Sequence, residues 1–117
     1  MSSGNIKRLL GAANKPDFVA GAGSSQATAA AVSKNGAVVS GANGTVGVIL
    51  PKVDPGVSVF IANPVNGALS VYPPSSQYIN AGNQNAAFTQ TALKNAIYTF
   101  CGTNSSGEDR WHAVLSA

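Results

Sequence analysis

The stretch Asp54-Pro55-Gly56-Val57-Ser58-Val59-Phe60-Ile61-Ala62 predicts a turn that leads directly into a β-strand. Proline followed by glycine is a favoured pair for the central positions of a tight turn. In the next six residues the two valines and Ile61 fall on one face, and Ser58, Phe60 and Ala62 fall on the other. This alternation with a period of two residues is that of a β-strand.

Short strands and turns recur on both sides of this segment. Asn35-Gly36 and Asn43-Gly44 favour β-hairpins, because both central residues of a type I′ turn need a positive φ. No long amphipathic stretch separates the strands, which argues against βαβ units. Strands are predicted over residues 26–33, 45–50, 57–62, 69–72, 77–79, 86–91, 96–101 and 110–115. The pattern predicts a mainly β fold, an antiparallel β-sandwich or barrel that is jelly-roll-like.

The beginning of the chain differs from the rest. Residues 1–17 are predicted to form a short N-terminal arm, and residues 18–117 a single β domain. Pro16 ends any helix at or before the preceding residue. The arm carries three apolar side chains and two cations: Ile6, Lys7, Arg8, Leu9 and Leu10. An arm of this kind is either loose or docked on another surface.

Composition limits the function further. Only 9% of the 117 residues are charged, against about 25% in a typical globular domain. The net charge of +3 comes from scattered cations, whereas nucleic-acid binding usually clusters them on one face, so we expect no nucleic-acid partner. No apolar run approaches the roughly 20 residues of a membrane span, so we expect no membrane partner. Cys101 lies in an apolar run and is predicted to be a small buried residue.

The residues that carry chemistry are few. His112 is the only histidine, and there are four carboxylates. A nucleophilic triad, a zinc site and an acid pair each need more groups at defined spacing, so we expect no enzyme activity, no metal and no cofactor. His112 is interpreted as a structural or interface residue. Tyr72, Tyr78 and Trp111 are candidates for stacking on a sugar ring or for packing in the core or an interface.

Several runs in the domain resemble a pattern found in small virion proteins of tailed bacteriophages. These runs are Gly47-Val48-Ile49-Leu50-Pro51, Pro55-Gly56 with Val57-Ser58-Val59-Phe60-Ile61-Ala62-Asn63, Leu69-Ser70-Val71-Tyr72-Pro73, and Arg110-Trp111-His112-Ala113-Val114. The chain is similar to capsid decoration (cement) proteins and to modules of phage fibres and spikes. The resemblance covers residues 26–115 and implies a β-rich homotrimer bound to a virion. It supplies no catalytic residue.

Two functions follow from the resemblance. The first is a decoration protein, made in the cytoplasm of the bacterial host, that binds the outer capsid surface as a trimer and clamps the major capsid protein. In that reading Ile6, Leu9 and Leu10 supply apolar contacts, while Lys7 and Arg8 face acidic shell surface. The alternative is a receptor- or glycan-binding module of a tail fibre or spike, which stacks a sugar on Tyr72, Tyr78 or Trp111. A fibre module is usually part of a longer chain, so we expect decoration.

Overall fold

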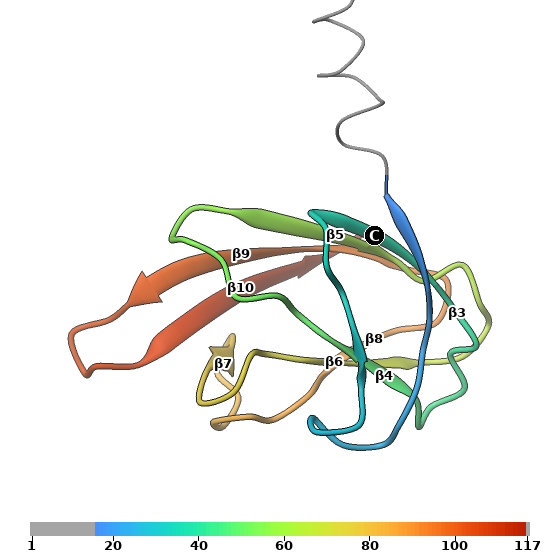
Figure 1. Cartoon of the computed structure of the whole chain (residues 1–117), viewed down its shortest axis with the longest axis horizontal. Coiled ribbons are helices and arrows are strands. Elements are labelled where there is room, and N and C mark those ends of the chain that lie inside the picture. The colour runs from blue at the N-terminus through green and yellow to red at the C-terminus, as the bar shows by residue number, and fades with distance from the viewer. Residues whose placement is uncertain (1–15, 117) are drawn as a thin grey trace, which may run out of the picture.

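The computed structural model describes residues 16–116, which form ten strands and no helix. The strands are β1 (Asp17–Ala20), β2 (Ala30–Ala31), β3 (Gly36–Ser40), β4 (Gly47–Ile49), β5 (Ser58–Ala62), β6 (Leu69–Tyr72), β7 (Tyr78–Ile79), β8 (Phe88–Gln90), β9 (Asn95–Thr103) and β10 (Asp109–Leu115). They make a six-stranded sheet in the order β1-β3-β5-β9-β10-β7 and a four-stranded sheet in the order β2-β4-β6-β8. The layer with β5, β9 and β10 lies above the layer with β4, β6 and β8 (Figure 1). The predicted mainly β class is confirmed.

The stretch from Asp54 to Ala62, which predicted the fold, contains strand β5. Val59 and Ile61 are fully buried, and Ser58 and Phe60 are exposed, so the predicted alternation is confirmed. Strand β5 lies near the middle of the larger sheet, parallel to β3 on one side and antiparallel to β9 on the other. Its inward residues therefore face the centre of the core.

The prediction of an antiparallel fold is wrong for the first half of the domain. Strands β1, β3 and β5 run parallel in one sheet, and β2, β4 and β6 run parallel in the other. Successive strands alternate between the two sheets, so the neighbours within a sheet are every second strand. Parallel neighbours need a connection that returns the chain to the same end of the sheet. Here a strand of the opposite sheet provides that connection instead of a helix. The parallel pairs exclude a jelly roll, whose strands are antiparallel.

The two Asn-Gly pairs explain the error. Both lie where the chain passes between sheets, so neither closes a hairpin between paired strands. Gly36 begins β3, and the Asn35 amide donates to the carbonyl of Ser58. At the second pair, Asn43 Oδ1 accepts hydrogen bonds from the backbone N–H of Thr45 at 3.0 Å and of Val46 at 3.1 Å. At both turns the chain passes from a strand of one sheet to a strand of the other.

The second half of the domain contains the antiparallel pairs. Strand β9 pairs antiparallel with β5 and with β10, and β8 pairs antiparallel with β6. Strand β7 adds a short parallel pair at the outer side of β10. The long β9–β10 hairpin extends beyond the rest of the sheet (Figure 1).

One hydrophobic core joins the two sheets. The larger sheet contributes Val39, Val59, Ile61, Tyr98 and Trp111, and the smaller contributes Val48, Leu69 and Val71. A buried hydrogen bond also crosses the interface: the Tyr98 hydroxyl on β9 donates to Gln90 Oε1 on β8 at 2.8 Å. The Gln90 amide in turn donates to the backbone carbonyls of Ile61 and Lys94. Every buried side-chain polar atom in residues 16–116 has a partner, so this network carries no penalty for unpaired polar groups.

The predicted junction between the arm and the domain, after residue 17, falls within strand β1. Strand β1 begins at Asp17, one residue before the predicted start of the domain, and pairs with β3 along its whole length. Residues 6–10, which were predicted to contact a capsid, lie outside the described residues. The described part of the arm is Pro16 and Asp17 at the edge of the larger sheet.

Candidate functional site

The outer surface of the six-stranded sheet carries a row of large apolar side chains. Phe60 on β5 lies directly opposite Ile97 on β9, and Ile97 lies directly opposite Val114 on β10. Each of the three points away from the core because its strand neighbours point inward. The exposed fractions are 39% for Phe60, 50% for Ile97 and 54% for Val114. These values are unusual for three adjacent side chains of this size on a surface that faces water.

The row lines a shallow groove. The groove has a volume of about 250 Å³ and is lined by Phe60, Asn95, Ala96, Ile97, Val114, Leu115 and Ser116. Apart from Phe60 and Ser116, its lining residues belong to β9 and β10, the longest strands of the sheet. A site on paired strands is held more rigidly than a site on loops, so the groove is a preformed surface.

The apolar surface continues to the edge of the sheet. In the same row as Phe60 lies Gly36 on β3, and a Cβ placed on Gly36 would lie 3.5 Å from the Cβ of Pro16. The neighbouring row holds Phe18, Val38 and Ala62, with Phe18 76% exposed. We call these residues the apolar face: Pro16, Phe18, Gly36, Val38, Phe60, Ala62, Ile97 and Val114.

Polar side chains border the apolar face on one side. Ser58, Thr99 and His112 form the next row across β5, β9 and β10. The Ser58 and Thr99 hydroxyls are 2.7 Å apart and hydrogen-bonded. His112 is exposed, and its interpretation as a structural or interface residue stays a prediction. Cys101 is exposed on the same side of β9, and the prediction that it is buried is wrong. Because Tyr98 and Phe100 point into the core, Cys101 must point outward.

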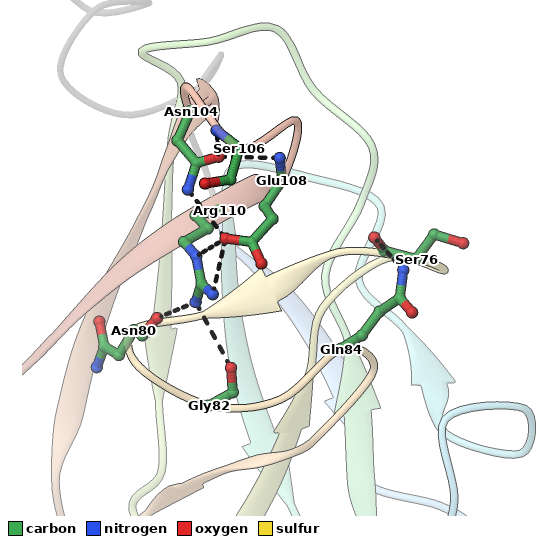
Figure 2. Close-up of polar contacts among 8 residues, drawn as sticks. All are labelled: Ser76, Asn80, Gly82, Gln84, Asn104, Ser106, Glu108 and Arg110. Atoms are coloured by element: carbon green, nitrogen blue, oxygen red, sulfur yellow. Dashed lines mark hydrogen bonds and ion pairs between the residues drawn. The ribbon is translucent and has the colours of Figure 1, made fainter.

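Tyr78 lies in a second, polar cluster at the edge of the sheet. Arg110 and Tyr78 are paired across β10 and β7, and the guanidinium carbon lies 4.4 Å from the centre of the Tyr78 ring. Figure 2 shows Arg110 between the Glu108 carboxylate and the backbone carbonyls of Asn80 and Gly82. Its Nη1 donates to the Asn80 carbonyl at 2.6 Å, and its Nη2 lies 3.0 Å from Glu108 Oε1. One face of the tyrosine ring is therefore already occupied.

The Glu108 carboxylate is also held from the β9–β10 loop. The Asn104 amide donates to Glu108 Oε1 at 3.0 Å (Figure 2). This hydrogen bond and that from Arg110 lower the pKa of Glu108, because both stabilise the charged form. The cluster fixes the loop after β7 against β10. Its hydrogen bonds and its ion pair join residues of the cluster to one another, as expected of a structural contact.

The other two aromatic candidates offer little surface. Trp111 is 1% exposed, and its indole N–H donates to Gln77 Oε1 at 2.7 Å. Its proposed stacking on a sugar is therefore wrong, because the ring packs in the core beside Phe100. Tyr72 is half-buried. Its ring lies over Gly47, where a Cβ would come within 2.9 Å of a ring carbon. The aromatic side chains thus do not form a joint platform.

Residues 16–116 also bear on metal binding and on crossing a membrane. No group of three or more histidine, cysteine, aspartate or glutamate side chains is arranged there to hold a metal ion. In the same residues there is no helix whose length and apolar character would let it cross a membrane. The apolar face is the feature of the described surface that most needs a partner.

A scan against protein-family models, a search of curated proteins and a search of solved structures each find no match to this chain. The function is therefore inferred from the chain's own residues and from the geometry of the apolar face.

Proposed function

We propose that this chain is a structural protein of a tailed-phage virion, without enzyme activity, that decorates the outer surface of the head as a homotrimer. In this role it is made in the bacterial cytoplasm and its partner is the major capsid protein. The observation that carries the proposal is the apolar face, because exposed contiguous apolar surface marks a site of protein contact. The resemblance of residues 26–115 to decoration proteins supports the choice of partner.

The charge distribution supports a role in a symmetric assembly. None of the side chains on the apolar face is charged, and its neighbours Ser58, Thr99 and His112 are polar. In an assembly of identical subunits, like charges on a shared surface repel one another. An uncharged surface avoids that repulsion at every copy. A partner that buries Phe60, Ile97 and Val114 gains the free energy of removing them from water.

The arm supplies a second contact in this proposal. Ile6, Leu9 and Leu10 contact apolar surface on the shell, and Lys7 and Arg8 face acidic groups there. A single arm binds weakly, because ordering each residue costs about 1–2 kcal/mol of backbone entropy. Three arms in one trimer act together, so their combined affinity exceeds that of one arm by avidity.

The alternative is a receptor- or glycan-binding module of a fibre or spike. Such a module needs an open aromatic surface for the sugar ring. The burial of Trp111 and the guanidinium over Tyr78 argue against this alternative.

The experiment is to count this chain in purified virions of the phage that encodes it, by quantitative mass spectrometry. A decoration protein is present in numbers comparable to the major capsid protein. A fibre or spike module is present in only a few copies, and that result would overturn the proposal. Light scattering on the free protein and a map of the decorated head then test the trimer.

A further inference from the structure

The sequence contains three Asn-Gly pairs, and their surroundings in the fold differ. The pairs are Asn35-Gly36, Asn43-Gly44 and Asn66-Gly67. In such a pair the backbone nitrogen of the glycine can attack the side-chain carbonyl carbon of the asparagine, because glycine has no Cβ to hinder the approach. Asparagine is among the thermally labile residues of proteins. Which pair reacts in the folded protein depends on whether the side-chain amide and the glycine nitrogen are free to meet.

Hydrogen bonds hold both halves of the second pair. Asn43 Oδ1 accepts from the backbone N–H groups of Thr45 and Val46 and from the Thr45 hydroxyl. The N–H of Gly44 donates to the carbonyl of Ala68 at 2.8 Å. An attack of the Gly44 nitrogen on the Asn43 side chain therefore has to break several hydrogen bonds first, which slows it.

The first pair is tied to strand β5. The Asn35 amide donates to the backbone carbonyl of Ser58 at 3.1 Å, and the Asn35 carbonyl accepts from the N–H of Phe60 at 2.8 Å. Gly36 is the first residue of β3. Side chain and backbone at Asn35 are thus both fixed by the neighbouring strand, and rotation of either one costs a hydrogen bond.

The third pair lies in the loop between β5 and β6, where Asn66 is exposed. Within residues 16–116 the Asn66 side chain makes no hydrogen bond, and the N–H of Gly67 donates to no protein group. The loop is held instead through its carbonyls. The Asn63 amide donates to the Gly67 carbonyl at 2.8 Å, and the N–H of Leu93 donates to the Val65 carbonyl at 3.1 Å. The two reacting groups are therefore free of the bonds that hold the other pairs.

Packing requires the glycine of this third pair. A Cβ placed on Gly67 would collide with the carbonyl oxygen of Ala42. Such a close approach of two backbone segments accepts only glycine. The fold therefore keeps an unhindered backbone nitrogen directly after an exposed asparagine.

We propose that Asn66 is a site of spontaneous deamidation in the folded protein. The Gly67 nitrogen forms a bond to Cγ of Asn66, the bond from Cγ to Nδ2 breaks, and the proton of the Gly67 N–H ends on the departing ammonia. The product is a cyclic imide, which water opens at either of its two carbonyls. One opening gives aspartate at position 66, and the other gives isoaspartate, whose main chain is longer by one methylene. Either product lowers the net charge of +3 by one unit.

This inference goes beyond the proposed function and does not rest on it, because it follows from the chemistry of one loop. The isoaspartate form places its extra methylene between the two anchored carbonyls, those of Val65 and Gly67. The protein therefore accumulates, with age, a second form that differs from the first in charge and in the backbone of this loop.

Peptide mapping by mass spectrometry measures the conversion at each pair after incubation of the full-length protein at mildly alkaline pH. The same incubation in denaturant gives the rate of each pair without the fold. In the folded protein we expect Asn66 to react at least about tenfold faster than Asn35 and Asn43, the factor for breaking one or two hydrogen bonds. In denaturant the three rates should converge. Equal rates in the folded protein, or a faster reaction at either of the other pairs, would overturn the proposal.

Two variants test whether Asn66 accounts for the charge change. Asn66→Gln has a longer side chain that closes a ring less readily, so the acidic form seen on ion exchange should accumulate more slowly. The matched control is Asn83→Gln, which changes an exposed asparagine that precedes Gln84 rather than glycine and should leave the rate unchanged. Equal accumulation of the acidic form in the wild type and both variants would place the modification elsewhere and overturn the proposal.

Discussion

Phe60 and Ile97 lie directly opposite each other on β5 and β9 with both side chains exposed, while the adjacent pair Ile61 and Ala96 is buried. The same two strands thus present an apolar surface on both faces of the sheet. The inward face is covered by the second sheet. The outward face has no cover within residues 16–116, which is why we assign it to a partner.

This contrast predicts very different costs for substitutions in neighbouring residues. Ile61→Ala leaves a cavity in the core and should lower the free energy of unfolding by about 2–5 kcal/mol. Ile97→Thr on the opposite face should lower it by less than about 1 kcal/mol, the value of a cross-strand pair. Chemical denaturation of the two variants measures both. A loss of several kcal/mol for Ile97→Thr would mean that this side chain is part of the core.

The burial of Tyr98 predicts how the free energy of unfolding changes at high pH. Burial raises the pKa of Tyr98 well above its ordinary value, which is about 10 in an unfolded chain. The folded state therefore keeps the proton when the unfolded state loses it. Stability from this group is fully present below about pH 10 and falls above it, by up to about 1.4 kcal/mol per pH unit.

The Tyr98→Phe variant separates the hydrogen bond of this hydroxyl from the effect of its ionisation on stability. At neutral pH it leaves Gln90 Oε1 without its donor, which should cost about 1–3 kcal/mol. Above pH 10 the variant should lose stability less steeply than the wild type. The measurement is the free energy of unfolding from pH 7 to 11, and parallel curves for the two proteins would contradict this role of Tyr98.

A backbone feature predicts a stabilising substitution. Leu93 has a φ of 65° and is 63% exposed. A side chain of this type in the left-handed region costs roughly 1–2 kcal/mol, whereas asparagine tolerates it. Leu93→Asn should therefore raise the free energy of unfolding by about 0.5–1 kcal/mol. A decrease on thermal or chemical unfolding would mean that the leucine contributes packing that outweighs the backbone cost.

The Arg110 cluster predicts local rather than global stability. Arg110→Ala removes the hydrogen bond to the Asn80 carbonyl and the cation over Tyr78. We expect faster hydrogen exchange at the amides of Asn80 and Gly82, by about tenfold, since exposed segments open independently of the core. Exchange at the buried strand β5 serves as the internal control. Unchanged exchange in the loop would show that Arg110 does not hold it.

The strands could be predicted from the sequence because their alternation is local. The inward side of β5 follows from valine and isoleucine alone. The pairing of the strands could not be predicted, because Asn43-Gly44 signals a reversal without saying whether the chain returns to the same sheet or to the other one. That choice depends on contacts such as Asp17 with Ala37, which are far apart in sequence.

The candidate site was predictable only in part. The sequence places Phe60 on the same predicted face of its strand as Ser58 and Ala62, opposite the valines. Ile97 and Val114 could not be joined to it, because the row depends on the register of three strands. The run from Ile97 to Cys101 is apolar on both faces, so alternation cannot tell which face is inward. The core packing of Tyr98 and Phe100 decides that, and it places Cys101 outside.

The most direct measurement is cosedimentation with phage heads that lack the protein. The wild type, Leu93→Asn and Ile97→Thr/Val114→Thr are each mixed with heads, and the heads are then heated. A protein that binds only the intact shell stabilises it by mass action. We predict that the wild type and Leu93→Asn pellet with the heads and raise their survival, while the double variant does neither. Equal binding and protection by the double variant would contradict the assignment of the apolar face as the contact surface.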